Sequence, residues 1–364
     1  MKNVSRMLFF ISFFYISLYA DGGKYWLVDE YLEKNPTQKQ LSKDFINIVR
    51  NDSVKISVKQ NQAVKIVIVY PGNQISDYWR RSKDSFEKRL QELGVKYVLE
   101  DHFTKPAIEI REQARFLLNA IKDDTDYLIF TLDALKHSHF VERILSKKKP
   151  KLLLQNITTP VKVWGNRQPF LYVGFDHVIG STMLADYYMK QTGGKGKYAV
   201  LYGSRGYVSH MRGKEFINYV TKNSDLKVVD SYYTDFNKEK SIEATEQLLK
   251  KYKDLDFIYA GSTDIALGVS EVLKKQNLTG KILTNGWGGG SNELKAIDQG
   301  LLDITVMRVN DDNGVAMAEA VKMDLEGKAH KVPTVFSGDF EIVKKGIQKD
   351  KIELLKKRAF RYSN

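Results

Sequence analysis

The sequence contains no cysteine and only seven prolines among its 364 residues. The absence of cysteine excludes disulfide bonds, zinc sites built on thiolates and cysteine nucleophiles. A chain of this length can bury a sizeable core without disulfides, so their absence also fits an oxidising compartment. No stretch rich in proline, or in glycine and serine, divides the chain. Domains within it are therefore expected to be joined by several short connections rather than by a long linker.

Motifs that carry catalytic or cofactor chemistry are also missing. The chain has no G-x-x-x-x-G-K-[ST] phosphate loop, no G-x-S-x-G elbow and no H-E-x-x-H zinc pair. Its first predicted strand is followed by Pro71-Gly-Asn-Gln, where a dinucleotide-binding enzyme would carry G-x-G-x-x-G. The histidines are dispersed, and each is interpreted as a surface or packing residue: His102, His137, His139, His177, His210 and His330. We therefore expect neither an enzyme nor a metal or cofactor site.

Long uncharged hydrophobic runs are scarce, and the clearest one lies at the start of the chain. Lys2 and Arg6 precede a run from Met7 to Ala20 that is rich in Leu, Ile, Phe and Tyr. The run is short for a membrane span, which needs about 20 apolar residues, and its flanks match a secretory signal peptide. We predict that residues 1–20 are a signal peptide cleaved on export to the periplasm, with an uncleaved anchor as the alternative.

The net charge of +13 raises the question of nucleic-acid binding. Acidic residues, however, are mixed with the lysines, as in residues 238–240 and 250–254, and no basic stripe interleaved with aromatics is present. This pattern favours a solvated basic surface over a nucleic-acid site.

Short β-branched runs alternate with helical patterns from Val64 onward, which is typical of parallel α/β sheets. The first series of predicted strands is 64–70, 95–99, 127–130 and 151–154. The second is 171–174, 198–202, 226–233, 257–260, 281–284 and 304–307. We predict an α/β protein of two doubly wound parallel-sheet domains, joined by a hinge of several crossovers.

Polar side chains follow several of the predicted strands, at the edge where ligands bind in open α/β sheets. They are Gln74, Ser76, Asp77 and Trp79; Thr131 and Asp133; Asn156; Ser262, Thr263 and Asp264; Asn285 and Trp287; and Arg308. Each one alone also fits a helix cap, a turn or a surface cation. Their convergence on one crevice favours a binding site. Amide, hydroxyl and carboxylate groups with two tryptophans suit a compact polyol ring.

Several of these stretches resemble the type I periplasmic sugar-binding fold family, and within it the members that bind autoinducer-2. The most specific stretches are residues 69–79, 127–133, 154–160, 172–177, 285–291 and 357–363. The resemblance implies a receptor that catalyses nothing and needs no cofactor. It implies that autoinducer-2, a furanosyl borate diester used in quorum sensing, binds between the domains. The implied partner is the periplasmic domain of an inner-membrane sensor histidine kinase.

The resemblance also implies a set of cleft residues and the domain boundaries. The ligand-binding residues would be Gln74, Ser76, Trp79, Thr131, Asn156, Arg212, Thr263, Asp264, Trp287 and Arg308. Residues 21–177 and 309–334 would form the N-terminal domain, and residues 178–308 and 335–364 the C-terminal domain. Arg212 and Arg308 are expected to select the borate anion over a neutral sugar, because guanidinium groups stay charged and present a fixed fork of donors.

Two other functions fit the sequence. The first is a ribose- or galactose-type sugar-binding protein that delivers its ligand to an ABC importer, since such proteins share the fold and the polar residue types. The second is a secreted carbohydrate-active enzyme, in which Asp77, Asp133 and Asp264 would have to supply an acid–base pair.

Overall fold

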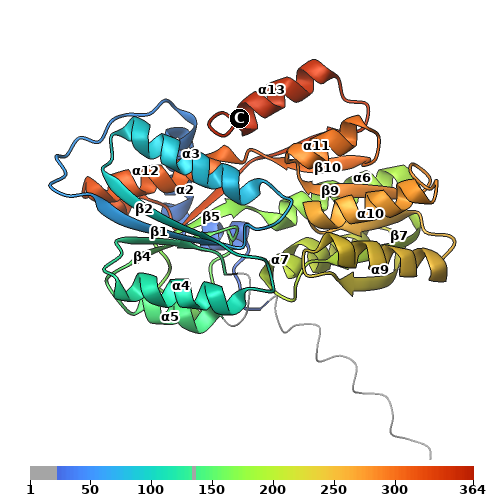
Figure 1. Cartoon of the computed structure of the whole chain (residues 1–364), viewed down its shortest axis with the longest axis horizontal. Coiled ribbons are helices and arrows are strands. Elements are labelled where there is room, and N and C mark those ends of the chain that lie inside the picture. The colour runs from blue at the N-terminus through green and yellow to red at the C-terminus, as the bar shows by residue number, and fades with distance from the viewer. Residues whose placement is uncertain (1–22, 133–136) are drawn as a thin grey trace, which may run out of the picture.

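The computed structural model describes residues 23–132 and 137–364, which form two α/β domains side by side (Figure 1). The predicted signal peptide and Asp133 lie outside the described residues. Each domain is built on one six-stranded sheet with helices on both faces. The predicted fold class is confirmed. Within the described part of the chain, no helix is both long and apolar enough to cross a membrane.

The N-terminal sheet is entirely parallel. In spatial order its strands are β2 (Tyr97–Phe103), β1 (Val64–Tyr70), β3 (Tyr127–Phe130), β4 (Lys151–Gln155), β5 (Leu171–Phe175) and β11 (Val335–Gly338). Side chains of β1 alternate between the two faces, as the pleat requires. Ile66 and Ile68 pack under α2 (Pro36–Arg50), α3 (Tyr78–Leu93) and α12 (Asp311–Leu325). Val67 and Val69 pack against α4 (Ile110–Lys122) and α5 (Ser138–Leu145). Burial on both faces explains the unbroken apolar run.

The C-terminal sheet has the same order with one antiparallel edge strand. Its strands are β7 (Asp225–Tyr233), β6 (Lys195–Tyr202), β8 (Phe257–Ala260), β9 (Leu283–Gly288), β10 (Ile304–Arg308) and β12 (Phe340–Lys344). One face is covered by α6 (His177–Thr192) and α8 (Glu215–Asn223). The other is covered by α9 (Lys238–Lys251), α10 (Thr263–Lys275), α11 (Ser291–Asp298) and α13 (Lys349–Ala359).

Between its strands, the described part of the chain crosses from one domain to the other three times. The first crossing follows β5 and the second follows β10, close to the predicted boundaries at 177 and 308. The third boundary, predicted after residue 334, is wrong by four residues. Val335 and Phe336 are buried in the N-terminal core, and β11 pairs in parallel with β5, so the chain crosses only after Gly338. Residues 335–338 therefore belong to the N-terminal domain.

The strand order places a switch point in each sheet, between β1 and β3 and between β6 and β8. At a switch point the connections leave in opposite directions, so a crevice opens beyond the carboxyl ends of these strands. The two helices that precede the first sheet, α1 (Val28–Lys34) and α2, pack on the N-terminal domain. After α13 the chain returns to that domain, where its C-terminus lies near α3 (Figure 1).

Candidate ligand-binding cleft

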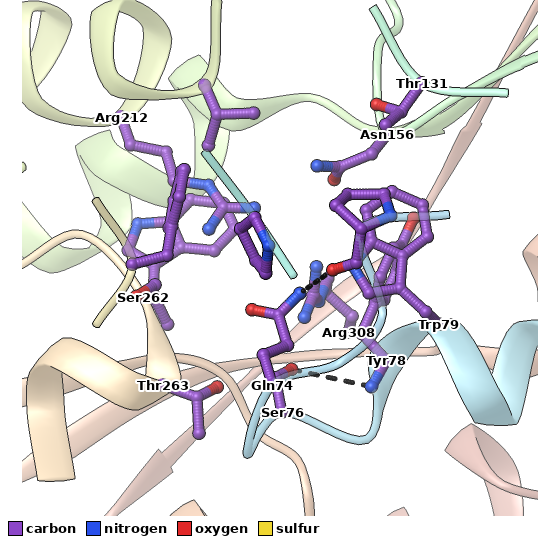
Figure 2. Close-up of a pocket in the computed structure, with 15 residues that line it drawn as sticks. Gln74, Ser76, Tyr78, Trp79, Thr131, Asn156, Arg212, Ser262, Thr263 and Arg308 are labelled. Carbon is purple, nitrogen blue, oxygen red and sulfur yellow. Dashed lines mark hydrogen bonds between the residues drawn. The ribbon is translucent and has the colours of Figure 1, made fainter. Parts of the chain in front are cut away.

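A pocket lies between the two domains at these switch points, and its enclosed cavity is narrow, ≈ 40 Å³. Figure 2 shows Thr131, Asn156 and Trp79 on one side of the pocket and Arg212, Ser262 and Thr263 on the other. The first three belong to the N-terminal domain and the other three to the C-terminal domain. A ligand in the pocket would therefore contact both domains.

The structure brings nine of the ten predicted site residues to this pocket. They are Gln74, Ser76, Trp79, Thr131, Asn156, Arg212, Thr263, Trp287 and Arg308. Their contacts with a ligand stay a prediction. The tenth, Asp264, does not line this pocket, and its position is described below.

Gln74 and Ser76 lie on the loop that follows β1, and Arg80 fixes the shape of that loop. The Arg80 guanidinium donates to the carbonyl oxygens of Gly72 and Gln74, each at 3.3 Å, and of Ser76 at 3.2 Å. The Gln74 amide Nε2 donates to the Pro71 carbonyl at 2.8 Å. These bonds satisfy backbone groups that the strand leaves unpaired, which holds the two side chains in place at the pocket.

Aromatic rings form the wall below this loop. The Trp79 ring lies 4.7 Å from the ring of Tyr70 and 4.8 Å from that of Tyr78, measured between centroids. Tyr78 is buried and receives a hydrogen bond from the Asn313 amide at 2.9 Å. This packing leaves the indole of Trp79 with little freedom, so it offers the pocket a rigid apolar face.

Asn156 enters the pocket from the end of β4 in a left-handed conformation, with φ of +64°. Asparagine adopts this conformation at less cost than most residues. Its carbonyl Oδ1 is buried and has no hydrogen-bond partner among the described residues. An unpaired buried acceptor is costly, so this oxygen suits a ligand hydroxyl.

Arg308, at the end of β10, is the most unusual group in the pocket. Its side chain is buried, and its Nε has no hydrogen-bond partner among the described residues. Its Cζ lies 3.9 Å from the centroid of the Tyr78 ring, a cation–π contact. Burial lowers the pKa of the Arg308 guanidinium, yet arginine remains protonated in proteins. The pocket thus contains a buried cation without an ion-paired carboxylate in the described part of the chain.

The three glycines at 288–290 leave room for neighbouring side chains. Gly288 has φ of +137°, and a Cβ at that position would lie 2.4 Å from Nη2 of Arg308. A Cβ on Gly290 would lie 2.2 Å from Oδ1 of Asp77. The glycine run therefore lets Arg308 approach the backbone of β9.

Arg212 reaches the pocket from a short π-helical segment, His210–Lys214. Its Nη1 donates to the Gly261 carbonyl at 3.1 Å, and its Cζ lies 3.8 Å from the centroid of the Trp287 ring. The Trp287 indole in turn donates to the Tyr259 hydroxyl at 3.0 Å. Trp287 therefore supports Arg212 as well as lining the pocket.

Asp264 was also predicted to bind the ligand, and for this residue too a contact with ligand stays a prediction. It does not line this pocket. Its carboxylate accepts hydrogen bonds from the backbone amides of Ile75 at 3.0 Å and Ser76 at 3.2 Å, across the cleft. These charge-assisted bonds satisfy two amides of the β1 loop. A similar bond joins the Ser291 amide to Asp77 at 3.1 Å. Both aspartates hold the domains together and neither faces the pocket.

Three residues at or behind the pocket are not in the predicted ligand-binding set. Tyr78 and Ser262 line the pocket, and His177 contacts Arg212 behind it. Ser262 was noted at a strand end, where it also serves as the N-cap of α10. In the sequence, nothing distinguished Tyr78 from its neighbour Trp79 as a site residue. His177 was interpreted as a surface or packing histidine, and it is buried as the latter predicts. Among residues 23–132 and 137–364, no cluster of His, Asp and Glu could hold a metal ion.

The model of the periplasmic binding protein domain family matches residues 66–329, which is most of the chain. The chain belongs to this family. It is 23% identical over 305 residues to the ribose import binding protein of Escherichia coli, covering 83% of this chain and 99% of that protein. It is likewise 23% identical over 274 residues to the D-allose-binding periplasmic protein of Escherichia coli, covering 73% and 86% of the two chains.

Solved structures show the same fold at low sequence identity. The glucose-galactose binding protein GanP of Geobacillus stearothermophilus matches with a TM-score of 0.69 and 22% identity, covering 79% of this chain and 100% of that one. XylFII in its complex with LytSN matches with a TM-score of 0.66 and 18% identity, covering 78% and 98%. These comparisons support a periplasmic ligand-binding protein of the sugar-binding class.

Proposed function

We propose that the protein is a periplasmic receptor that captures a small cyclic polyol between its two domains. The family match and the ribose- and allose-binding relatives support the ligand class. A ligand that contacts both walls of the pocket stabilises the closed arrangement through its higher affinity for that state. Of the three aspartates that a carbohydrate-active enzyme would need, Asp77 and Asp264 bond to loop groups outside the pocket. The enzyme alternative thus receives no support.

The observation that most restricts the ligand is the buried cation Arg308. Burying a charge without a direct ion pair costs several kcal/mol, which Glu293 and Asp77 offset only through space, and an anionic ligand in contact would offset more of that cost. The lining side chains of the described residues include two arginines and no carboxylate. We therefore favour an anionic polyol. Autoinducer-2 combines a furanose-like ring with the single charge of a tetrahedral borate diester, as in the receptor LuxP that the sequence resembles.

The second candidate is a neutral ribose- or allose-type sugar for an ABC importer. The curated relatives favour this candidate over autoinducer-2, because their names refer to ribose and allose and they align over most of their length. The polar groups of Asn156, Gln74 and Thr263 would serve a sugar equally well.

Borate dependence distinguishes the two ligands. In borate-free buffer, we expect neither ribose, allose nor dihydroxypentanedione alone to raise the thermal midpoint of the exported protein. Dihydroxypentanedione with boric acid should raise it, because a ligand that binds only the folded state stabilises by RT ln(1 + [L]/Kd). A midpoint raised by ribose or allose without borate would instead assign the protein to sugar transport.

We also infer that the receptor acts through a membrane-bound sensor histidine kinase. The sequence resemblance suggests this partner, and XylFII offers a case in which the same fold forms a complex with a second protein. Immobilised exported protein should retain such a kinase from detergent-solubilised inner membranes, in an amount that changes when ligand is added. If an importer permease is retained and the kinase is not, the proposed partner is wrong.

A further inference from the structure

His177 lies at the first crossing between the domains, where it begins α6. Its side chain is 1% exposed. Its ring stands 5.3 Å from the Trp287 ring and 5.7 Å from the Tyr207 ring, measured between centroids. An apolar side chain could fill this position equally well. It could not make the hydrogen bonds that the imidazole of His177 makes.

Each ring nitrogen of His177 meets a partner of fixed chemistry. Nε2 lies 3.1 Å from the backbone carbonyl of Asn156, which can only accept a hydrogen bond. Nδ1 lies 3.3 Å from Nε of Arg212, which can only donate one. Nε2 must therefore carry the proton and Nδ1 must lack it. The surroundings select one neutral tautomer of the ring.

The two partners belong to opposite walls of the cleft. Asn156 follows β4 of the N-terminal domain, whereas Arg212 belongs to the C-terminal domain, and both line the pocket. Arg212 is thus held on three sides: by His177 at Nε, by the Gly261 carbonyl at Nη1 and by the Trp287 ring under Cζ. Three contacts in different directions fix the plane of the guanidinium.

The charges around His177 keep it neutral. Burial, first of all, and then the cations Arg212 and Arg308 lower the pKa of His177 well below its usual value. On its own element, the Asp176 carboxylate is engaged with the Val178 amide at 2.9 Å. Within the described residues, no carboxylate forms an ion pair with the ring.

We propose that His177, as the Nε2–H tautomer, is a positioning residue that orients Arg212 toward the ligand and ties it to Asn156 at the hinge. The role in ligand binding rests on the proposed function, whereas the tautomer does not. A protonated ring would place an N–H against the Arg212 N–H and a second cation beside it, so only the neutral form can perform this role.

The tautomer is tested on the ligand-free protein by two-bond proton–nitrogen NMR of the full exported chain with labelled histidine. The resonance missing in His177→Phe assigns the ring. We expect an unprotonated Nδ1 and a protonated Nε2, unchanged between about pH 8 and pH 5.5. The opposite tautomer, or titration near the ordinary histidine pKa, would overturn the proposal even if no ligand binds.

The positioning role is tested by calorimetric titration of three variants with dihydroxypentanedione plus boric acid, and with ribose and allose. His177→Asn places an acceptor near the site of Nδ1, His177→Gln places a donor near the site of Nε2, and His177→Phe retains only bulk. We expect His177→Phe and His177→Gln to lose about 10- to 100-fold in affinity, and His177→Asn to recover most of the loss. If His177→Phe binds as tightly as the wild-type protein, His177 has only a packing role. If the wild-type protein binds none of the ligands, the proposed function fails and the NMR result decides the tautomer alone.

Discussion

Replacing Arg308 with methionine is expected to weaken ligand binding by at least about a hundredfold, while the ligand-free protein becomes no less stable. The two effects have opposite signs because the side chain is buried without an ion-paired carboxylate in the described residues and with Nε unbonded. Removing one partner of a buried charged contact costs about 2–5 kcal/mol of binding free energy. Removing the buried charge relieves its desolvation cost, which the Glu293 and Asp77 carboxylates offset only through space.

Methionine suits this test because it keeps an unbranched apolar stem against Tyr78. Calorimetric titration with the borate ester measures the affinity, and urea unfolding of the ligand-free protein measures the free energy of unfolding. Arg115→Met is the matched control, since Arg115 is 62% exposed and pairs with Glu112 on the surface of α4. A ligand that binds Arg308→Met as tightly as wild type would remove the basis for an anionic ligand. If ligand-free Arg308→Met unfolds at a much lower urea concentration than wild type, Arg308 stabilises the fold itself.

The closed arrangement depends partly on bonds that involve no ligand. Asp264 binds the Ile75 and Ser76 amides across the cleft, and Asp77 accepts from the Ser291 amide and hydroxyl. These contacts lower the free energy of the closed state whether or not the pocket is filled. A ligand then shifts the equilibrium only by its difference in affinity between the two states. Arg308 and Arg212, which line the pocket, are the groups through which an anion would create that difference.

The positions of the strands were predictable because parallel strands are buried on both faces. Residues 64–70 form an unbroken apolar run, and β1 occupies them. The polar residues after such runs lie at one edge of the sheet by geometry, which is why Thr131, Asn156 and Arg308 could be assigned to one crevice. The strand order was not predicted, since local patterns do not reveal which strands are neighbours.

Features that depend on contacts between the domains escaped prediction. The Asp264 side chain turns to amides that lie 188 and 189 residues away in sequence, and no local pattern signals such a partner. β11 and β12 are adjacent in sequence yet join different sheets, so residues 333–344 could not be divided between the domains from hydrophobicity alone. His177 looks like any helix-starting histidine until the fold places Arg212 beside it.

The largest effect on stability is expected where α3 packs on α12. These helices approach so closely that a Cβ on Gly314 would lie 2.5 Å from the backbone nitrogen of Phe86. Arg89 and Glu319 form a buried ion pair across this contact, with Nε and Nη2 of Arg89 at 2.8 and 2.6 Å from Oε1 of Glu319. Both side chains are almost completely inaccessible to solvent. Arg89 also donates to the Asn51 carbonyl at 3.0 Å.

Arg89→Met is expected to lower the free energy of unfolding by about 3–5 kcal/mol, because it leaves the Glu319 carboxylate buried with only Lys322 nearby, at 3.8 Å. Burial raises the pKa of Glu319, whereas Arg89 opposes that rise. In the variant the folded-state pKa rises further above the unfolded value, so the folded form favours the protonated acid. The loss in free energy of unfolding relative to wild type should therefore be complete at pH values above the raised pKa of Glu319. It should become smaller as the pH falls through that pKa.

Urea unfolding at about pH 7.5 and pH 5 measures both the loss and its pH dependence. The double variant Arg89→Met with Glu319→Leu removes both charges and should regain most of the stability, since paired apolar replacements at buried ion pairs are often neutral or stabilising. Arg115→Met, at an exposed pair, should change the free energy of unfolding by less than about 1 kcal/mol. A loss in Arg89→Met as small as that of the control would show that the carboxylate finds another partner. A double variant as unstable as the single one would show instead that the other Arg89 contacts, with the Asn51 carbonyl and the Tyr362 hydroxyl, hold the helices together.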